Sequence, residues 1–470
     1  MAQTILCVDI GTSSIKGGVF EEDGNVLQLL RIPLADPGSE NFKQFDPKRW
    51  EEAFKILVSR LNTPFPDCLI FSGQGPTLIP LDKEGNPTFF GLLWLDGREH
   101  PVPEGKSLFL PKVRWFQENA REAYERTTRF LSCPEYLIYK LTGEGITVSP
   151  SEEFDPYYWN REELNKYGLP SDLFPPLIRP ATLIGKVSKE RASNFGLKPN
   201  LKVYAGGPDY LMSLLGTATT EKGRTCDRAG TSEGINVCVP KPVQYRGLRC
   251  LPHIVPGLYT LAGMLASSGR LFEWFRELTN QKTLAYDQMM ESIQTLLPEV
   301  LRTPGRFPSF FPFTQPGNGW DFSRGIFVGL GTEHGKTELG FAVVEAIGFA
   351  VRSTIEKLEH AGCPIDVLRV SGGQANNRIW NYMKASIVGK PLMIPHVKDA
   401  ELAGGLAIVC TAEGLYKNFV EAADHLVRFE ELIEPSLPFE TFFRERYEQY
   451  KEQCGKFMDA LGSDTTQCFE

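Results

Sequence analysis

The chain has 470 residues, of which 42% are hydrophobic and 23% are charged, the composition of an ordinary soluble globular protein. This length exceeds the ~250–300 residues at which a single hydrophobic core stops growing, so the sequence predicts two sizeable domains. The formal net charge of −8 argues against nucleic acid or an acidic membrane surface as a partner, because both select basic proteins.

The cysteines and histidines indicate neither disulfides nor zinc. The ten cysteines are scattered without a C-x-x-C pair, and the six histidines show no metal-ligand spacing relative to them. We expect no signal peptide, and no apolar run approaches the roughly 20 residues needed to cross a bilayer. We therefore expect reduced, buried thiols, no membrane segment and a cytoplasmic location.

The first predicted element is a hairpin at residues 5–20. An apolar run ends in Asp9, a Gly-Thr-Ser-Ser turn follows at residues 11–14, and a second apolar run begins. Backbone N–H groups and hydroxyls gathered in such a turn suit a small anion, and Asp9 at its mouth suits a divalent metal that bridges phosphate oxygens. The alternative is that Asp9 and Thr12 only stabilise a tight turn.

The next elements extend this opening. A strand at residues 26–32 follows a polar turn, so the chain begins with a meander rather than a βαβ unit. Apolar side chains recur at helical spacing over residues 46–61. Residues 67–74 indicate a buried strand with a polar end at Gln74, and in α/β sheets such strand ends carry ligand contacts.

Asp209 lies where a strand becomes a helix. The short strand at residues 201–205 is followed by Gly206-Gly207-Pro208 and then by a helical pattern. An aspartate in this position is commonly an N-cap. The alternative is that its carboxylate acts on a ligand, and the local residues leave both interpretations open.

The second half repeats the theme. Residues 223–238 again show strand, Gly-Thr-Ser turn and strand, which predicts a duplicated architecture with one phosphate loop per half. Residues 368–377 predict a strand that runs into a glycine pair and a helix, where a flat ligand can approach the backbone closely. Residues 329–337 look like a P-loop, but Leu330 takes the place of the first glycine, so we reject that interpretation.

Together these motifs resemble those of the FGGY carbohydrate kinases. The segments that carry the resemblance occur in the family's order: DIGTSSIK (9–16), SGQ (72–74), WLDGR (94–98), AGGPD (205–209), AGTSEGI (229–235) and SGGQANN (371–377). The resemblance implies an α/β protein of two ribonuclease H-like (actin-like ATPase) domains, each a five-stranded mixed sheet flanked by helices, with a cleft between them. It implies domains at 1–222 and 223–437, followed by a helical extension at 438–470.

The resemblance also implies a reaction, the ATP-dependent phosphorylation of a sugar hydroxyl with ATP and Mg²⁺ as cofactors. Asp209 matches the general base, Asp9 matches the carboxylate near the metal, and Mg-ATP is expected between the two Gly-Thr-Ser loops. The positions that match the nucleotide site are Gly11, Thr12, Ser13, Ser14, Lys16, Gly230, Thr231, Gly269, Gly372, Gly373 and Asn377. Those that match the sugar site are Gln74, Gly75, Pro76, Trp94, Asp209 and Tyr210.

The sugar side departs from the family's pattern. Gly75-Pro76 stand where xylulose kinases usually have Met-His and glycerol kinases have Arg-Glu, and Tyr210 stands where Asn or Gln is usual. Because a site that loses polar partners changes strongly in what it rejects, we expect a ketose such as a pentulose, or a related polyol, rather than glycerol.

Two alternatives accompany this prediction. The chain could be a catalytically silent relative that senses sugar and nucleotide, and the intact Asp9, Thr12, Thr231 and Asp209 argue against this. It could also be a chaperone-like or filament-forming ATPase, but the SGQ, WLDGR and GGPD motifs belong to the sugar-kinase branch. The implied partners are the small-molecule sugar and ATP, and a homodimer is compatible with the sequence.

Overall fold

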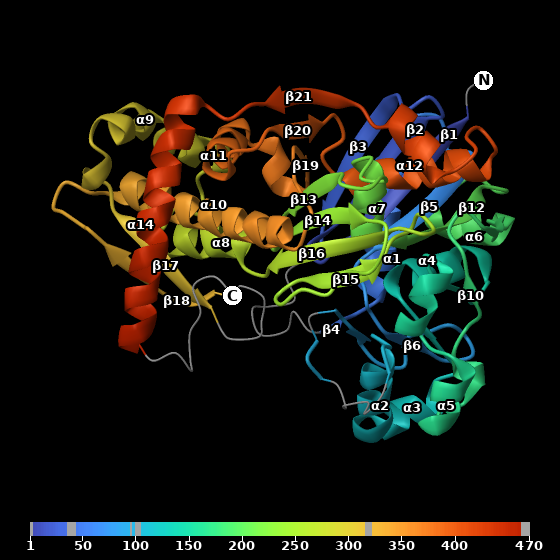
Figure 1. The fold of residues 1–470 in the computed structure, drawn as a ribbon. Helices are drawn as coiled ribbons and strands as arrows, with labels where there is room; N and C mark the ends of the chain where they lie inside the picture. Colours follow the sequence, from blue (N-terminus) through green and yellow to red (C-terminus); the bar gives the residue numbers. More distant parts are fainter. Residues whose placement is uncertain (1–2, 35–43, 95, 99–104, 315–321, 462–470) are drawn as a thin grey trace. The chain divides into compact units, whose positions relative to one another are not determined.

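The computed structural model describes residues 3–34, 44–94, 96–98, 105–314 and 322–461. The chain divides into two compact units (Figure 1). Unit 1 comprises Met1–Thr220, Pro252–Gly257 and Asp399–Val427, and unit 2 comprises Glu221–Leu251, Leu258–Lys398 and Arg428–Glu470. Leu95 of the WLDGR motif and residues 462–470 of the expected C-terminal extension lie outside the described residues.

The sheet of unit 1 has six strands in the order β11-β12-β5-β1-β2-β3. They are β1 (Thr4–Ile10), β2 (Ser14–Glu21), β3 (Val26–Pro33), β5 (Cys68–Gly73), β11 (Leu183–Lys186) and β12 (Lys202–Pro208). The first three form the expected antiparallel meander, and β5 and β12 run parallel to β1. Every residue of β1 and β5 is buried, which is typical of central strands covered on both faces.

Helices cover both faces of this sheet. Because successive side chains of a strand point to opposite faces, Val8 belongs to the core beneath α1 (Lys48–Ser59) and α4 (Cys133–Thr142), whereas Cys7 faces α12 (Ala400–Ala412). α12 packs against α7 (Asp209–Gly216) and α13 (Phe419–Leu426). The remaining elements of unit 1 are β4 (Gln44–Phe45), β6 (Ile79–Leu81), β7 (Gly91–Leu92), α2 (Leu110–Asn119), α3 (Arg121–Arg126), β8 (Arg129–Leu131), β9 (Thr147–Val148), η1 (Glu152–Tyr157), α5 (Arg161–Lys166), η2 (Ser171–Leu173), β10 (Leu177–Ile178) and α6 (Lys189–Phe195).

The sheet of unit 2 has seven strands in the order β15-β16-β14-β13-β19-β20-β21. They are β13 (Thr225–Ala229), β14 (Glu233–Val239), β15 (Arg249–Pro252), β16 (Tyr259–Leu265), β19 (Leu368–Ser371), β20 (Leu392–Pro395) and β21 (Phe429–Ile433). β13, β14 and β16 are antiparallel neighbours, with β15 between β14 and β16 in the sequence, and β19 and β20 run parallel to β13. The five central strands therefore repeat the order and directions of unit 1, which confirms the duplicated architecture; β11, β15 and β21 are edge strands added to the expected five.

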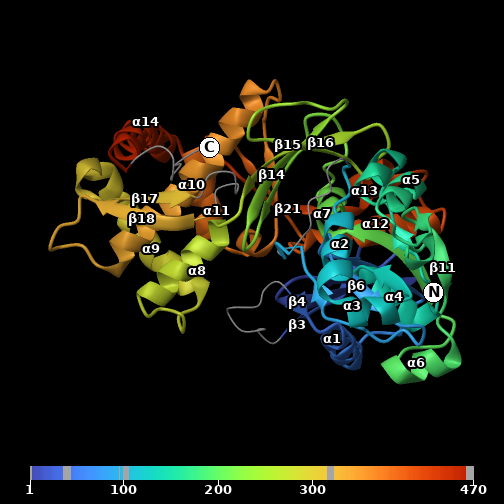
Figure 2. The same cartoon turned by 90° about the horizontal axis from the view of Figure 1, so that it is seen from below.

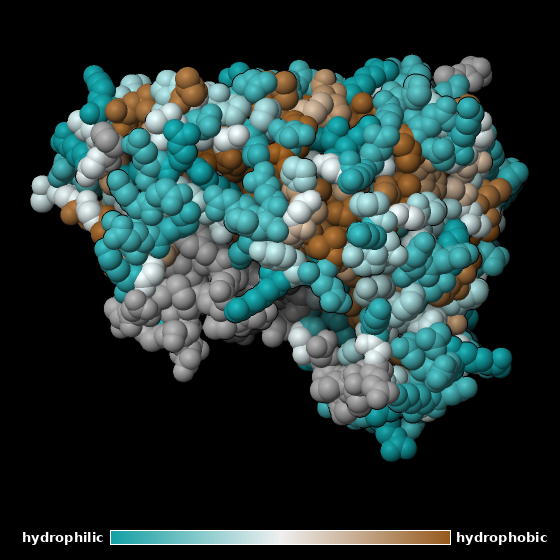
Figure 3. All heavy atoms as spheres, in the orientation of Figure 1, coloured by the Kyte–Doolittle hydropathy of each residue, from teal (hydrophilic) through white to brown (hydrophobic). Residues whose placement is uncertain are grey.

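The helices of unit 2 enclose a large aromatic and aliphatic core. They are α8 (Ser268–Leu278), α9 (Tyr286–Arg302), η3 (Pro304–Arg306), α10 (Lys336–His360), η4 (Gly373–Asn376), α11 (Arg378–Val388) and α14 (Leu437–Leu461). The hairpin of β17 (Ser309–Thr314) and β18 (Phe322–Val328) packs beside α10 (Figure 2). α14 buries Phe443, Tyr447 and Tyr450, while the side that it shows in Figure 3 is mainly hydrophilic.

One segment is grouped differently from the predicted domains. Asp399–Val427 falls in the predicted second domain by sequence but packs within unit 1. The reason is α12, which is buried from Ala400 to Cys410 and needs cover on every side. Within the part of the chain that the structure describes, no helix is both long and apolar enough to span a membrane.

Candidate functional site

In unit 1 a polar cluster forms around Asp9, near the end of β1. Ser72 donates a hydrogen bond of 2.8 Å to Asp9 Oδ1, and Lys16 Nζ lies 3.5 Å from Asp9 Oδ2. The strand register produces both contacts, because Asp9 pairs with Lys16 across β1–β2 and with Ser72 across β1–β5. The contacts of Asp9 thus run to the two neighbouring strands.

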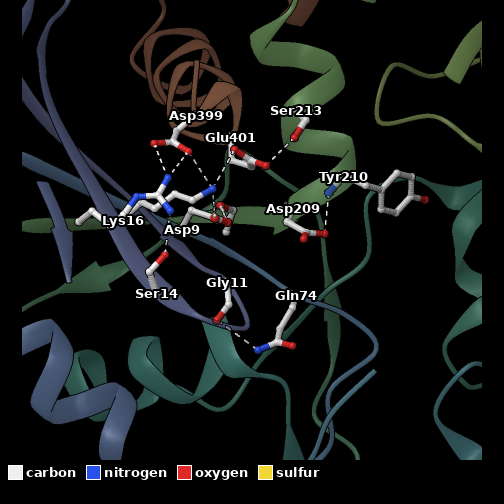
Figure 4. A network of polar contacts seen from close by, with 12 residues as sticks. Asp9, Gly11, Ser14, Lys16, Gln74, Asp209, Tyr210, Ser213, Asp399 and Glu401 are labelled. Carbon is white, nitrogen blue, oxygen red and sulfur yellow. Dashed lines mark hydrogen bonds and ion pairs between the residues drawn. The ribbon is translucent and has the colours of Figure 1, made fainter. Parts of the chain in front are cut away.

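Two acidic residues at the start of α12 complete the surroundings of Lys16 (Figure 4). Lys16 Nζ lies 3.0 Å from Asp399 Oδ1 and 3.7 Å from Glu401 Oε2. Ser213 of α7 donates a hydrogen bond of 2.8 Å to Glu401 Oε1. Arg31 also pairs with Asp399, at 3.0 Å.

Sequence analysis missed Asp399 and Glu401. The signal that could have found them is an acidic pair at the start of a helix that is otherwise apolar. A buried carboxylate needs a cation or hydrogen-bond donors nearby, so an acidic side chain on such a helix indicates a partner elsewhere in the fold. The sequence did not show which partner, because Lys16 is brought there by the sheet.

The electrostatics of the cluster favour an additional cation. Burial raises the pKa of Asp9 to about 7; the carboxylates of Glu401 and Asp209 also raise it, whereas Lys16 and Ser72 lower it. Burial opposes the charge of Lys16, yet the surrounding carboxylates hold its pKa above the usual value. The single ammonium group of Lys16 thus interacts with several carboxylates. The effect of the Asp209 carboxylate on the pKa of Asp9 shows that these two residues are neighbours.

Asp209 is the first residue of α7, and the N-cap is Pro208. The alternative that Asp209 is the N-cap is therefore not what the structure shows. Its Oδ1 accepts a hydrogen bond of 2.7 Å from the backbone N–H of Tyr210. The carboxylate is half-buried at a helix N-terminus, where the helix dipole favours the ionised form. In Figure 4 the ring of Tyr210 points away from this carboxylate, and its hydroxyl is buried.

Gln74 connects the first Gly-Thr-Ser turn to the end of β5. Its Nε2 donates to the carbonyl of Gly11 at 3.3 Å, and its Oε1 accepts from the Thr12 hydroxyl at 3.2 Å. Trp94 Nε1 donates to Thr12 Oγ1 at 3.4 Å, and the residue is 39% exposed. A Cβ atom added at the exposed Gly75 meets nothing within 4 Å. The structure thus brings several of the predicted sugar and phosphate residues around one turn.

The other predicted nucleotide and sugar positions of this region differ in their exposure and in their protein partners. Pro76 is half-buried and Ser13 is exposed, whereas Ser14 is buried. Arg31 donates to Ser14 Oγ at 3.4 Å, so this hydroxyl has a protein partner. Lys16, predicted to contact nucleotide, is engaged by the carboxylates described above.

In unit 2, close backbone contacts bring together several predicted nucleotide residues. A Cβ atom on Gly269 would lie 2.1 Å from the carbonyl oxygen of Gly230. One on Gly372, whose φ is +86°, would lie 2.5 Å from the carbonyl oxygen of Ala229. No side chain fits at either position, so α8, the second Gly-Thr-Ser turn and the end of β19 meet backbone to backbone. Thr231 at the tip of this turn is exposed.

Gly373 and Asn377 lie in the segment that follows β19. Gly373 is exposed, and a Cβ atom there meets nothing within 4 Å. Asn377 caps α11, because its Oδ1 accepts from the backbone N–H of Trp380 at 2.8 Å, and its Nδ2 donates to Asp287 at 2.7 Å. Asn377 therefore has a structural role, and its contact with nucleotide stays a prediction.

Comparison with known proteins decides the family. The sequence matches the N-terminal domain of the FGGY family of carbohydrate kinases over residues 104–216 and its C-terminal domain over residues 228–413, together more than half of the chain. The chain belongs to the FGGY family of carbohydrate kinases. It is a phosphotransferase, and kinases of this family use ATP and a sugar substrate as small-molecule partners.

Individual relatives of this FGGY kinase carry several names. A xylulose kinase from Staphylococcus epidermidis is 26% identical over 96% of this chain and 96% of its own. An autoinducer-2 kinase from Yersinia enterocolitica is 23% identical over 94% of this chain and 92% of its own. The crystal structure of a xyloylose kinase from Brucella ovis has a TM-score of 0.79 at 23% identity and covers 98% of this chain and 100% of its own. This likeness shows that the FGGY kinase has the expected fold of two mixed α/β domains.

Proposed function

We propose that this FGGY kinase transfers the terminal phosphoryl group of ATP to a hydroxyl of a ketose, such as a pentulose, or of a related polyol. The observation that carries the proposal is the pair of carboxylates Asp9 and Asp209, which interact in unit 1 but occupy different surroundings. Asp9 is buried and held by Ser72 and Lys16, whereas Asp209 is half-buried at the start of a helix. Two carboxylates in different environments suit two different tasks.

Asp209 is the general base of this proposal. The N-terminus of α7 favours its ionised form, which accepts the proton of the attacking sugar hydroxyl. A single oriented carboxylate suffices, because phosphoryl transfer depends on positioning and charge neutralisation more than on covalent help. The backbone N–H of Tyr210 fixes one oxygen of the carboxylate and so orients the other.

Asp9 is the residue that would hold Mg²⁺. No group of three or more His, Cys, Asp or Glu side chains could hold a metal ion among the residues that the structure describes. Kinase Mg²⁺, however, is commonly bound by one or two carboxylates together with substrate phosphates and water. The raised pKa of Asp9 fits this role, because a bound cation relieves its crowded negative charge. When bound, the ion neutralises phosphate charge.

The phosphate and nucleotide contacts come from backbone-rich turns. In unit 1 the turn from Gly11 to Ser14 offers N–H groups and the Thr12 hydroxyl, and Gln74 holds the turn in place. In unit 2 Gly230 and Thr231 offer the equivalent groups. Support for the second turn comes from Gly269 and Gly372, which have no side chain and pack directly against the backbone at this turn.

The sugar is proposed to bind beside the first turn. The exposed ring of Trp94 provides an apolar face for the C–H groups of a sugar, and Gln74 provides an amide near the same turn. The open space at Gly75 leaves room for a larger substrate than a Met-His pair would admit. The ring of Tyr210 points away from Asp209. We therefore assign stacking against the sugar to Trp94 rather than to Tyr210.

The test is a coupled assay for ADP release with purified protein and a panel of pentuloses, hexuloses, sugar alcohols, glycerol and gluconate. We expect sugar-dependent ADP release with at least one ketose or polyol and little with glycerol. The double variant Gly75→Met with Pro76→His should shift the ratio of kcat/KM values toward D-xylulose. Preference of the unaltered chain for D-xylulose over the whole panel would contradict this account of the pocket, and sugar binding without any ADP release would indicate a silent sensor.

A further inference from the structure

A buried cluster of charged side chains in unit 2 is not used by the proposed reaction. Lys384 Nζ on α11 lies 2.7 Å from Asp227 Oδ2, 2.6 Å from Glu233 Oε1 and 3.2 Å from Gln374 Oε1. The side chains of Lys384, Asp227 and Glu233 are 2%, 0% and 0% exposed. Burying three ionisable groups is costly unless they are paired and hydrogen-bonded, so their presence indicates a specific arrangement that they maintain.

The cluster links both ends of the second Gly-Thr-Ser turn to the segment after β19. Asp227 lies on β13 shortly before Gly230, and Glu233 is the first residue of β14, directly after the turn. Gln374 lies in η4, two positions beyond Gly372. A single ammonium group therefore contacts both strands that flank the turn and the segment that follows β19.

Asp227 of this cluster retains a proton at neutral pH. Asp227 Oδ1 and Glu233 Oε2 are buried and, when both groups are carboxylates, have no hydrogen-bond donor among the described residues. Burial, the charge of Glu233 and a hydrogen bond with Glu233 raise the pKa of Asp227 to about 8, against the opposing effect of Lys384. A proton that Asp227 retains at neutral pH offsets part of the negative charge beside Lys384.

The geometry around the turn leaves little tolerance for displacement. Gly372 and Gly269 approach the backbone of Ala229 and Gly230 so closely that even a methyl group would collide. A shift of the turn against η4 would therefore break these contacts or open a gap. The charged groups that act on Asp227 are Glu233 from β14 and Lys384 from α11, and Gln374 from η4 is the neutral polar group of the cluster.

We propose that Lys384 is a positioning residue for the nucleotide: together with Asp227, Glu233 and Gln374 it holds the second Gly-Thr-Ser turn against the end of β19 in the arrangement that binds ATP. This inference rests on the proposed function, in which Gly230 and Thr231 contact ATP. The competing interpretation is that the cluster only stabilises unit 2. The two differ in what the loss of Lys384 does to ATP affinity.

The chain offers a matched control for that difference. Arg446 of α14 binds both oxygens of Glu345 of α10, at 2.6 and 2.7 Å, and their side chains are 10% and 1% exposed. This ion pair is also buried in unit 2 but holds α14 against α10 rather than the turn. Arg446→Met thus removes a comparable buried ion pair without touching the cluster.

The first experiment measures ATP and sugar KM values for the full-length wild type, Lys384→Met and Arg446→Met, together with melting temperatures. Lys384→Met should raise the KM for ATP on the order of tenfold, the scale expected when a site residue is displaced slightly, and change the KM for sugar by less than about twofold. Arg446→Met should lower the melting temperature with the KM for ATP unchanged. Equal KM values for ATP in the two variants would overturn the inference.

The variant Thr231→Ala separates this inference from the proposed function. It removes an exposed hydroxyl of the turn and leaves the cluster intact. If Thr231→Ala raises the KM for ATP while Lys384→Met does not exceed Arg446→Met, the positioning role fails and the nucleotide site stands. If Thr231→Ala leaves the KM for ATP unchanged, the Thr231 hydroxyl does not contact ATP and that part of the proposed function fails, while the comparison of Lys384→Met with Arg446→Met still decides the positioning role.

A second measurement stays informative if Lys384→Met does not fold. Glu233→Gln offers an amide donor toward Asp227 at every pH, while its oxygen still accepts from Lys384. Because the pKa of Asp227 is raised to about 8, Asp227 of the wild type loses its proton above about this pH, so the KM of the wild type for ATP should rise between pH 7 and pH 9 relative to that of Glu233→Gln. Parallel pH profiles for the two proteins would overturn the inference.

Discussion

At the scale of single residues, the central assignment is Asp209. Its Oδ1 accepts from the backbone N–H of Tyr210, a contact that an asparagine oxygen also makes, so Asp209→Asn should fold normally. We expect its kcat to fall by at least ~10²–10⁴-fold, because the proton acceptor is lost, with the KM for ATP retained. Steady-state kinetics and a melting curve measure this.

Asp82→Asn is the matched control for that variant. Asp82 is also half-buried and accepts a hydrogen bond of 2.8 Å from the backbone N–H of Asn86 in a turn, so its replacement should leave kcat unchanged. If Asp209→Asn retains more than about a tenth of wild-type turnover, Asp209 is a helix-terminal residue and not the base.

Glu135 gives a residue-scale prediction about stability. It is 5% exposed on α4, its Oε1 accepts from the backbone N–H of Val148 at 3.0 Å, and burial raises its pKa to about 7. Because the folded pKa lies above the unfolded value, this carboxyl contributes stability at low pH that is lost as the pH rises toward 7. The loss from this group between pH 5 and pH 8 is at most about 3 kcal/mol.

Glu135→Gln keeps the acceptor for Val148 and cannot ionise. Its free energy of unfolding, measured in urea, should therefore increase relative to the wild type as the pH rises from 5 to 8. Other titrating groups, such as Asp9 and Asp227, are common to both proteins and cancel in the difference. Curves that stay parallel across this range would mean that Glu135 titrates normally.

At the scale of secondary-structure elements, the contact between α7 and α12 controls the site. A Cβ atom on Gly404 would lie 2.1 Å from the carbonyl oxygen of Met212, and one on Gly216 would lie 1.7 Å from that of Ala400. The two helices begin with Asp209 and with the Ala400–Glu401 pair, so their close approach places Glu401 beside Lys16 and within reach of Ser213.

Gly404→Ala tests this contact. The methyl group must separate the helices, which we expect to cost about 1–3 kcal/mol of stability and to lower kcat, because Asp209 and Glu401 move with their helices. Gly455→Ala on α14 is the control: nothing lies within 4 Å of the added atom, so stability should rise by about 0.5–1 kcal/mol. Thermal and urea unfolding measure the stability of both variants, and kcat is measured in parallel. Equal changes in stability and kcat for the two variants would show that α7 and α12 tolerate separation.

At the scale of the whole molecule, unit 1 is built from separate stretches of the chain. A fragment that ends at the predicted boundary, residue 222, lacks α12 and exposes the apolar surface of α7, β1 and β5 that α12 covers. We expect this fragment to be insoluble or unfolded. Adding residues 399–427 through a flexible Gly/Ser linker should restore a cooperative unfolding transition, measured by circular dichroism. A cooperatively folded fragment without residues 399–427 would show that α12 is dispensable.

The two units share a strand order but stabilise their Gly-Thr-Ser turns differently. In unit 1 the lysine beside the turn comes from the hairpin itself, Lys16 on β2, and its carboxylates Asp399 and Glu401 come from α12. In unit 2 the carboxylates Asp227 and Glu233 come from the hairpin, and the lysine comes from α11. In each unit, buried or half-buried ion pairs therefore connect the hairpin of the turn to a helix. The helix supplies carboxylates in unit 1 and the lysine in unit 2.

Elements whose evidence is local could be predicted from the order of the amino acids. Alternating and helical apolar spacing, together with the two Gly-Thr-Ser turns, predicted the first meander, the second hairpin, their duplication and the positions of Asp9 and Asp209 at strand ends. Because these features depend on a few consecutive residues, the amino-acid sequence alone is sufficient to predict them. The family likewise followed from short motifs in a fixed order.

Which distant side chains meet depends on how the helices and sheets pack in three dimensions. Asp399 and Glu401 reach Lys16, and Lys384 reaches Asp227 and Glu233, because helices from remote segments pack on the sheets. No local periodicity encodes such pairs, since the packing of whole elements sets them. For the same reason the sequence could not show that Asp399–Val427 packs within unit 1. A helix that is apolar on all sides is expected to be buried, but its sequence does not indicate which strands cover it.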